Sequence, residues 1–157
     1  MPLQTTGAGT LRAVDHLCVA SVALTYVICV IWAFVDGNAQ AWGLVIVPGL
    51  GFVLLSWVRA RINAPRPYEL AAVNPLLDSS THGKSFPSRH VGSGALIGSS
   101  LVFIHPLLGI GVLLITLVLA IVRVTGRVHF VRDVVVGYVA GVAFGFAGMF
   151  LFTLIIS

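Results

Sequence analysis

The chain has 157 residues, of which 58% are hydrophobic and only 9% are charged. Soluble domains carry about 25% charged residues, so this composition excludes an ordinary soluble protein. A mean hydropathy of +1.04 likewise indicates a chain that lies mainly in lipid. The formal net charge of +4 does not point to nucleic acid, because the basic residues lie between apolar runs and form no exposed stripe. The length favours one domain, residues 1–157.

Five apolar segments follow one another along the chain. They cover residues 17–35, 41–58, 91–104, 107–122 and 134–156. A spanning helix needs about 20 apolar residues and at least about 17, which the first, second and fifth segments provide. The third and fourth reach that length if their helices include flanking polar residues. We therefore predict an all-α, polytopic bundle of about five transmembrane helices, multi-pass in the cell membrane.

The first segment has an alternative interpretation as a signal peptide, since Ala39, Gln40 and Ala41 resemble a cleavage site. Its apolar run exceeds the usual length of about 7–15 residues, and only Arg12 carries a fixed positive charge before it. A spanning helix is therefore preferred.

Three glycines recur every four residues in the fifth segment, at Gly137, Gly141 and Gly145. Such spacing lets two helix backbones approach closely in lipid. We expect this packing to occur within one chain, although the same glycines would also suit a homo-oligomer.

The number of spans decides on which side of the membrane each polar segment lies. With five alternating helices, the amino terminus, residues 59–90 and residues 123–133 share one side, and the other connections share the opposite side. All nine lysines and arginines then lie on the first side: Arg12, Arg59, Arg61, Arg66, Lys84, Arg89, Arg123, Arg127 and Arg132. The positive-inside rule would place that side in the cytoplasm. It does not explain why histidines and an aspartate accompany the cations, since ionisable groups at membrane depth are usually functional.

Arg59 and Arg66 form the first cluster at this face. Pro65 and Pro67 flank Arg66 and restrict it to an extended or turn conformation. A guanidinium held in this way suits bidentate contact with phosphate oxygens. Alone, such a stretch is more often a lipid-headgroup contact.

A second cluster lies immediately before the third apolar segment. Pro87 suits the first turn of a helix, whose backbone N–H groups would then form an anion site. Ser88 adds a hydroxyl donor, Arg89 a positive charge and His90 a proton donor, with Lys84 and Pro87 as accessory residues.

The third cluster contains Arg123, His129 and Asp133. His129 and Asp133 are four residues apart, which would place them one above the other on a helical face. The carboxylate can then fix one imidazole nitrogen as N–H and leave the other free to attack. A helix-capping ion pair is the alternative if the pair is considered alone.

Taken together, two histidines, a carboxylate and at least four cations indicate phosphoryl transfer by covalent catalysis. His129 would attack phosphorus, His90 would protonate the leaving oxygen, and the arginines would stabilise the negative charge of the transferred group. Two histidines and an aspartate could bind Zn²⁺, but the surrounding cations oppose a metal ion. We therefore expect neither a metal nor another cofactor.

The three clusters resemble the signature of the type 2 phosphatidic acid phosphatase family, which also includes vanadium haloperoxidases. The family pattern is Lys-x6-Arg-Pro, Pro-Ser-Gly-His and Ser-Arg-x5-His-x3-Asp. This chain has Arg59-x6-Arg66-Pro67, Pro87-Ser88-Arg89-His90 and Val122-Arg123-x5-His129-x3-Asp133. The resemblance covers residues 59–133. It implies that His129 is the nucleophile, His90 the general acid and Asp133 the orienting residue, with Arg59, Arg66, Ser88 and Arg123 as the phosphate cradle.

Three positions depart from the family pattern. Arg59 replaces Lys and keeps the charge, Arg89 replaces Gly and adds a bulky cation beside the phosphate, and Val122 replaces Ser and loses a hydroxyl. Membrane members usually have six spans, so the sixth would be missing at the amino end. Bacterial relatives usually place the site outside the cytoplasm, opposite to the positive-inside expectation, and both sides remain open.

The predicted function is a membrane lipid phosphatase that hydrolyses a phosphomonoester or diphosphate through a phosphohistidine intermediate. The resemblance implies phosphatidic acid, phosphatidylglycerol phosphate or a polyprenyl diphosphate such as undecaprenyl diphosphate as the substrate. A non-catalytic lipid-phosphate binder or transporter is the alternative, supported by Arg89 and Val122. A haloperoxidase is a remote third, because vanadate mimics phosphate.

Overall fold

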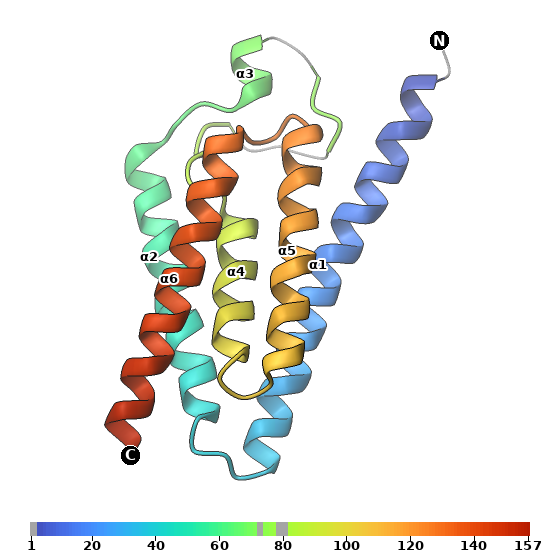
Figure 1. Ribbon diagram of the computed structural model, residues 1–157. Helices are drawn as coiled ribbons and strands as arrows, with labels where there is room; N and C mark the ends of the chain where they lie inside the picture. Colours follow the sequence, from blue (N-terminus) through green and yellow to red (C-terminus); the bar gives the residue numbers. More distant parts are fainter. Residues whose placement is uncertain (1–2, 72–73, 78–81) are drawn as a thin grey trace.

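The computed structural model describes residues 3–71, 74–77 and 82–157. Within these ranges the regular elements are all helices, which confirms the predicted all-α class. They are α1 (Leu3–Val35), α2 (Ala41–Ile62), α3 (Pro67–Ala71), α4 (Arg89–Leu101), α5 (Pro106–Thr125) and α6 (Val131–Ile156). Figure 1 shows the five longer helices side by side as a bundle, with the short α3 at the top.

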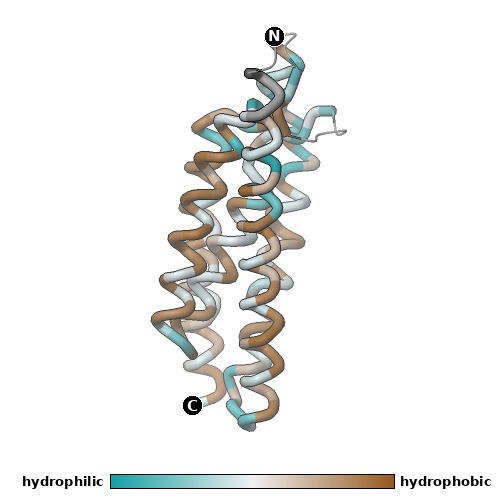
Figure 2. Tube along the Cα trace, turned by 90° about the vertical axis from the view of Figure 1, so that its right-hand side faces the viewer, coloured by the Kyte–Doolittle hydropathy of each residue, from teal (hydrophilic) through white to brown (hydrophobic). Residues whose placement is uncertain are grey.

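Four helical stretches in the described part of the chain are long and apolar enough to cross a membrane. They are Gly7–Val35, Ala41–Ala71 (which contains α2, α3 and the four non-helical residues between them), Pro106–Thr125 and Val131–Ile156. Many of their large apolar side chains are exposed on the outside of the bundle, as contact with lipid requires. Figure 2 shows hydrophobic residues along most of the bundle and hydrophilic residues mainly toward its ends. The chain is therefore a multi-pass membrane protein.

The helix in segment 91–104 differs from the other four. α4 has 13 residues, which at about 1.5 Å per residue extend about 20 Å, less than the roughly 30 Å of a hydrocarbon core. It packs against α2, α5 and α6, and most of its residues are buried. Because protein surrounds it, α4 can carry glycines and serines that a lipid-facing helix would replace with larger apolar residues. The expectation of about five spans is thus close to four full-length spans and one shorter inner helix.

Three glycines of α6, Gly137, Gly141 and Gly145, face α4 and the residue before it. A Cβ atom added at Gly137 would lie 2.7 Å from the carbonyl oxygen of Ser88, and one at Gly141 would press against the carbonyl oxygen of Gly92. The backbone N–H of Ser88 also donates a hydrogen bond to the carbonyl oxygen of Asp133 at 2.9 Å. The close approach predicted for these glycines therefore occurs within the chain, and it fixes the second sequence cluster beside the third.

We expect Gly141→Ala to lower stability by about 1–3 kcal/mol, because the new methyl group would force two helix backbones apart. The measurement is the thermal midpoint Tm of the protein in detergent. Gly111→Ala in α5 is the matched control, since a Cβ atom there meets nothing within 4 Å. Equal Tm values for the two variants would show that the α4–α6 interface tolerates the methyl group.

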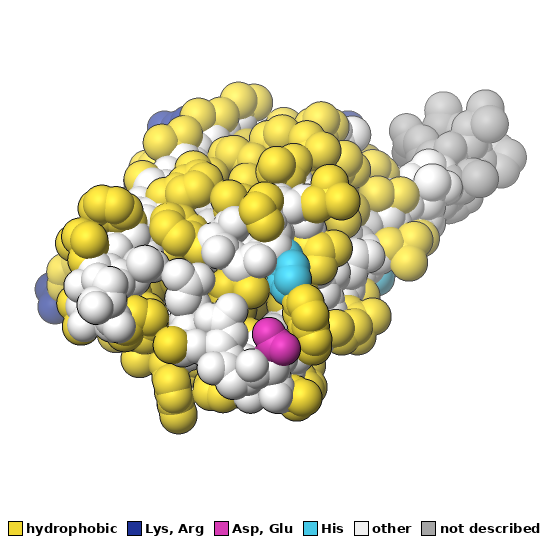
Figure 3. Space-filling model, turned by 60° about the horizontal axis from the view of Figure 1, so that its bottom comes forward, with side chains coloured by type: hydrophobic (Ala, Val, Ile, Leu, Met, Phe, Trp, Pro, Cys, Tyr) yellow, Lys and Arg dark blue, Asp and Glu magenta, His cyan; other side chains and the backbone are white. Residues whose placement is uncertain are grey.

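The chain direction brings the polar segments to one end of the bundle. α2 and α5 end there, and α4 and α6 begin there, at the top of Figure 1. The opposite end, brought forward in Figure 3, is covered largely by hydrophobic side chains. All three sequence clusters therefore lie at the same end of the molecule, as the helix count predicted.

Candidate active site

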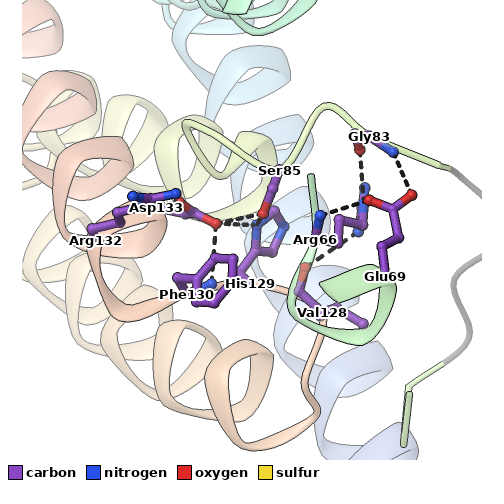
Figure 4. Close-up of polar contacts among 9 residues, drawn as sticks. All are labelled: Arg66, Glu69, Gly83, Ser85, Val128, His129, Phe130, Arg132 and Asp133. Carbon is purple, nitrogen blue, oxygen red and sulfur yellow. Dashed lines mark hydrogen bonds and ion pairs between the residues drawn. The ribbon is translucent and has the colours of Figure 1, made fainter. Parts of the chain in front are cut away.

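The first cluster lies at the end of α2 and in the segment that follows it. Arg59 is in the last turn of α2 and is buried. Residues 63–66 are not helical, as the flanking prolines predicted. Arg66 is also buried, and its Nε donates a hydrogen bond to the carbonyl oxygen of Gly83 at 3.0 Å, while its Nη1 lies 3.4 Å from the carbonyl oxygen of Val128 (Figure 4). These bonds fix the guanidinium beside His129.

Glu69 in α3 was not predicted from the sequence, yet it secures Arg66. Its Oε2 accepts a hydrogen bond from the backbone N–H of Arg66 at 2.6 Å, and its Oε1 accepts one from the backbone N–H of Gly83 at 2.8 Å. One carboxylate therefore links the backbone at Arg66 to the backbone at Gly83, on either side of the Arg66 side chain, as Figure 4 shows.

The second cluster forms the start of α4. Ser88 is the N-cap, so the helix begins two residues after Pro87 and not at the proline as expected, because Ser88 is extended and takes the capping position. Pro87 is buried and Lys84 is exposed. The Ser88 hydroxyl is buried without a hydrogen-bond partner among the described residues. A helix N-terminus with an unused hydroxyl favours an anion.

The third cluster follows α5. His129 was expected on a helix with Asp133, but it lies two residues before α6, and Asp133 in the first turn reaches back to it. Both side chains are buried, and His129 Nδ1 lies 3.6 Å from Asp133 Oδ2. The same oxygen accepts a hydrogen bond from the backbone N–H of Phe130 at 3.0 Å. Arg132 Nε lies 3.5 Å from the other carboxylate oxygen (Figure 4).

Burial governs the protonation of His129. Burial lowers the pKa of the imidazole below its ordinary value, Asp133 partly opposes this change, and the charge of Arg66 adds to the lowering. The neutral imidazole is therefore the dominant form at neutral pH. With Nδ1 directed at the carboxylate, the lone pair of Nε2 is available for attack.

Ser85 is a site residue to which the sequence analysis assigned no role. Its buried hydroxyl donates a hydrogen bond to Asp133 Oδ2 and lies 3.5 Å from His129 Nδ1. The hydroxyl therefore lies beside the histidine–aspartate contact, and Ser85 is placed to position the carboxylate. Only its place just before the second cluster could have pointed to this role.

We expect Ser85→Ala to lower kcat about tenfold with a smaller change in KM, because a charged hydrogen bond to Asp133 is lost. The effects of Ser85→Ala and Asp133→Asn on kcat should not add, since the serine acts through the carboxylate. Ser99→Ala is the matched control: Ser99 is equally buried but bonds backbone carbonyls. Additive losses in the double variant would argue that Ser85 only supports the fold.

Arg123 forms a buried ion pair with Asp15 of α1. Its Nη2 donates a hydrogen bond to Asp15 Oδ2 at 2.8 Å, and its Nε lies 2.7 Å from Oδ1. The two side chains are only 10% and 9% exposed. Asp15 lies just before the first apolar segment, and its partner lies 108 residues away, so no local spacing relates the two.

Val122 and Arg89, two of the departures from the family signature, have clear places in the structure. Val122 is buried and packs with Leu77 and Val128, so its methyl groups fill the position where a hydroxyl was expected. Arg89 is exposed, and its guanidinium lies 5.6 Å from the ring centroid of Phe52 in α2. It therefore lies outside the buried group of arginines.

His90 lies between two cavities. A largely apolar cavity of about 270 Å³ is lined by residues from α1, α2, α4 and α5, including Phe52, Arg89, His90 and Ile97. A polar cavity of about 240 Å³ is lined by Arg12, Asp15, His16, Val19, Leu77, His90 and Arg123. Burial, together with the nearby charges of Arg123, Arg89 and Arg59, lowers the pKa of His90 to about 3, so its proton-donating imidazolium form requires the negative charge of a bound phosphate. The predicted acid thus lies where a charged centre borders an apolar space.

The model of the PAP2 superfamily matches residues 40–155. The chain belongs to the PAP2 superfamily. A search among curated proteins finds no match.

Two solved structures are similar to this chain. The first is a transmembrane PAP2-type phosphatidylglycerolphosphate phosphatase from Bacillus subtilis, with 23% identity and a TM-score of 0.73, over 96% of this chain and 77% of that one. The second is LpxE from Aquifex aeolicus, with 23% identity and a TM-score of 0.68, over 95% of this chain and 96% of that one. At this identity the likeness establishes the fold. It includes α1, all of which precedes the residues that the family model matches.

Proposed function

We propose that the protein is a membrane lipid phosphatase that hydrolyses a lipid phosphomonoester or diphosphate through a phosphohistidine intermediate, without a metal ion. The observation that carries this proposal is the buried, neutral His129, held by Asp133 and Ser85 beside the guanidinium of Arg66. We also propose that residues 1–157 act as one phosphatase domain.

In the first step, Nε2 of His129 forms a bond to phosphorus while the bond from phosphorus to the leaving oxygen breaks. The electron pair of that bond goes to the leaving oxygen, which takes a proton from the imidazolium form of His90 and leaves that imidazole neutral. Arg59, Arg66 and Arg123, with the Ser88 hydroxyl, stabilise the negative charge of the transferred group. Since these cations already supply the positive charge, the reaction has no need of a metal ion.

In the second step, water attacks the phosphorus of the phosphohistidine and His90 accepts its proton. The bond between phosphorus and Nε2 breaks, its electron pair returns to the imidazole, and inorganic phosphate leaves. Throughout, Asp133 keeps the Nδ1 proton of His129 in place, so that Nε2 alternates between free and phosphorylated forms.

The apolar cavity beside His90 supports a lipid as the leaving group. A proton delivered by His90 reaches an oxygen at the border of this cavity, and its walls are formed by helices that face the bilayer. Phosphatidic acid, phosphatidylglycerol phosphate and polyprenyl diphosphates all combine a terminal phosphate with apolar chains. A phosphatidylglycerolphosphate phosphatase among the similar structures adds weight to this class.

The test is phosphate release by the full-length protein reconstituted in lipid vesicles that contain each of these three lipids in turn. We expect inorganic phosphate from at least one lipid, with undiminished rates in EDTA and inhibition by vanadate. Protein that binds the lipids tightly but releases no phosphate would favour the non-catalytic binder or transporter. Loss of activity in EDTA would contradict the metal-free mechanism.

A further inference from the structure

Arg89 occupies the position where the family signature has glycine, and its surroundings differ from those of the other signature arginines. Arg59, Arg66 and Arg123 are buried, whereas Arg89 is exposed at the first residue of α4. Its guanidinium lies over the ring of Phe52, 5.6 Å from the centroid. Both residues line the apolar cavity.

This placement puts Arg89 on the leaving-group side of the site. His90, the next residue, lines the same cavity and would deliver the proton to the leaving oxygen. The rest of the leaving group must extend from this oxygen into the cavity, because the transferred phosphate lies against the buried arginines on the other side of His90. The first atoms of the leaving group therefore lie within reach of the long Arg89 side chain.

The charge of the leaving group decides what Arg89 contributes. A phosphomonoester such as phosphatidic acid leaves as a neutral alcohol, which offers a guanidinium no negative charge to pair with. Phosphatidylglycerol phosphate leaves as an alcohol whose phosphodiester charge lies several atoms away from the leaving oxygen. A lipid diphosphate leaves as a lipid monophosphate, whose charged oxygens accept strong hydrogen bonds from arginine. The aromatic ring of Phe52 holds the guanidinium on one face and leaves its N–H edges available.

We propose that Arg89 is a specificity-determining residue that selects lipid substrates with an anionic leaving group, namely lipid diphosphates. The inference rests on the proposed phosphatase function and adds the substrate class. In the reaction, Nε2 of His129 bonds to the terminal phosphorus and the bridging P–O bond breaks. The electron pair stays on the bridging oxygen, and the lipid monophosphate leaves with a proton from His90 and its remaining charge paired with Arg89.

The experiment compares two substrates with the same polyprenyl chain, one a diphosphate and one a monophosphate, in vesicles with the full-length protein. Arg89→Gly restores the family residue, and Arg89→Lys keeps a positive charge. Arg61→Gly is the matched control, because Arg61 is also exposed and lies 5.1 Å from the ring centroid of Trp57, yet does not line the cavity.

We expect Arg89→Gly to lower kcat/KM for the diphosphate roughly 10- to 100-fold, the usual effect of removing a hydrogen bond to a charged group. The monophosphate should change less than about threefold, Arg89→Lys should retain part of the discrimination, and Arg61→Gly should change neither rate. An equal fall for both substrates would overturn the inference and place Arg89 among the residues of the general cradle. Wild-type protein that hydrolyses neither lipid would overturn the proposed function itself.

Discussion

His129→Ala is expected to abolish phosphate release from every lipid substrate, with kcat at least about 10⁴-fold below that of the wild-type protein. The imidazole is the nucleophile in the proposed mechanism, and alanine leaves no atom that could form the bond to phosphorus. The arginines would still bind the lipid phosphate, so KM or the binding constant should change far less than kcat. The measurement is the initial rate of inorganic phosphate release from vesicles.

A matched control separates this effect from damage to the fold. His105, at the opposite end of the bundle, stacks on Trp32 with ring centroids 4.2 Å apart. His105→Ala removes a half-buried imidazole from a helix terminus away from the site, and we expect it to retain full activity. Undiminished activity in His129→Ala would contradict the mechanism.

The covalent intermediate has its own readout. A substrate labelled with ³²P in the terminal phosphate should transfer label to the wild-type protein within one turnover, in a bond that is labile to acid and stable to alkali. His129→Ala should take up no label. Label that survives acid would contradict a phosphohistidine and point to an ester on a serine.

The sequence was most informative about which polar segments meet. Five apolar runs alternate in direction, so Arg66, His90 and His129 had to share a face, whatever the packing of the helices. This prediction needs only the number of times that the chain crosses the membrane. It was therefore insensitive to the shortness of α4, which still returns the chain to the opposite end before α5 begins.

The residues that escaped prediction act across long distances in the chain. Glu69 bonds the backbone of Gly83, Ser85 bonds Asp133, and Asp15 pairs with Arg123. Each contact depends on how two segments pack, which no local spacing encodes. The predicted start of α4 at Pro87 was also two residues too early. A proline suits the first turn of a helix, but it is equally acceptable in the residue before the N-cap, which is where Pro87 lies.

Asp15→Ala is expected to destabilise the protein by about 3–5 kcal/mol, because it leaves the buried guanidinium of Arg123 without its counter-charge. The same change should lower kcat/KM roughly 100-fold, since Arg123 is no longer held in the orientation that the cradle requires. The exposed neighbour His16, which lines the same polar cavity, provides the matched control: His16→Ala should change stability little. The measurements are denaturant unfolding in detergent and phosphate release.

The double variant Asp15→Ala/Arg123→Ala distinguishes an ion pair from simple packing. It removes both charges, so it should recover much of the stability lost in Asp15→Ala, while its activity stays low because the cradle lacks an arginine. A double variant less stable than either single variant would show that the two side chains act independently. The recovery would establish that α1, which lies wholly outside residues 40–155 of the family match, supplies a working part of the site. α1 would then be needed for catalysis as well as for anchoring the chain in the membrane.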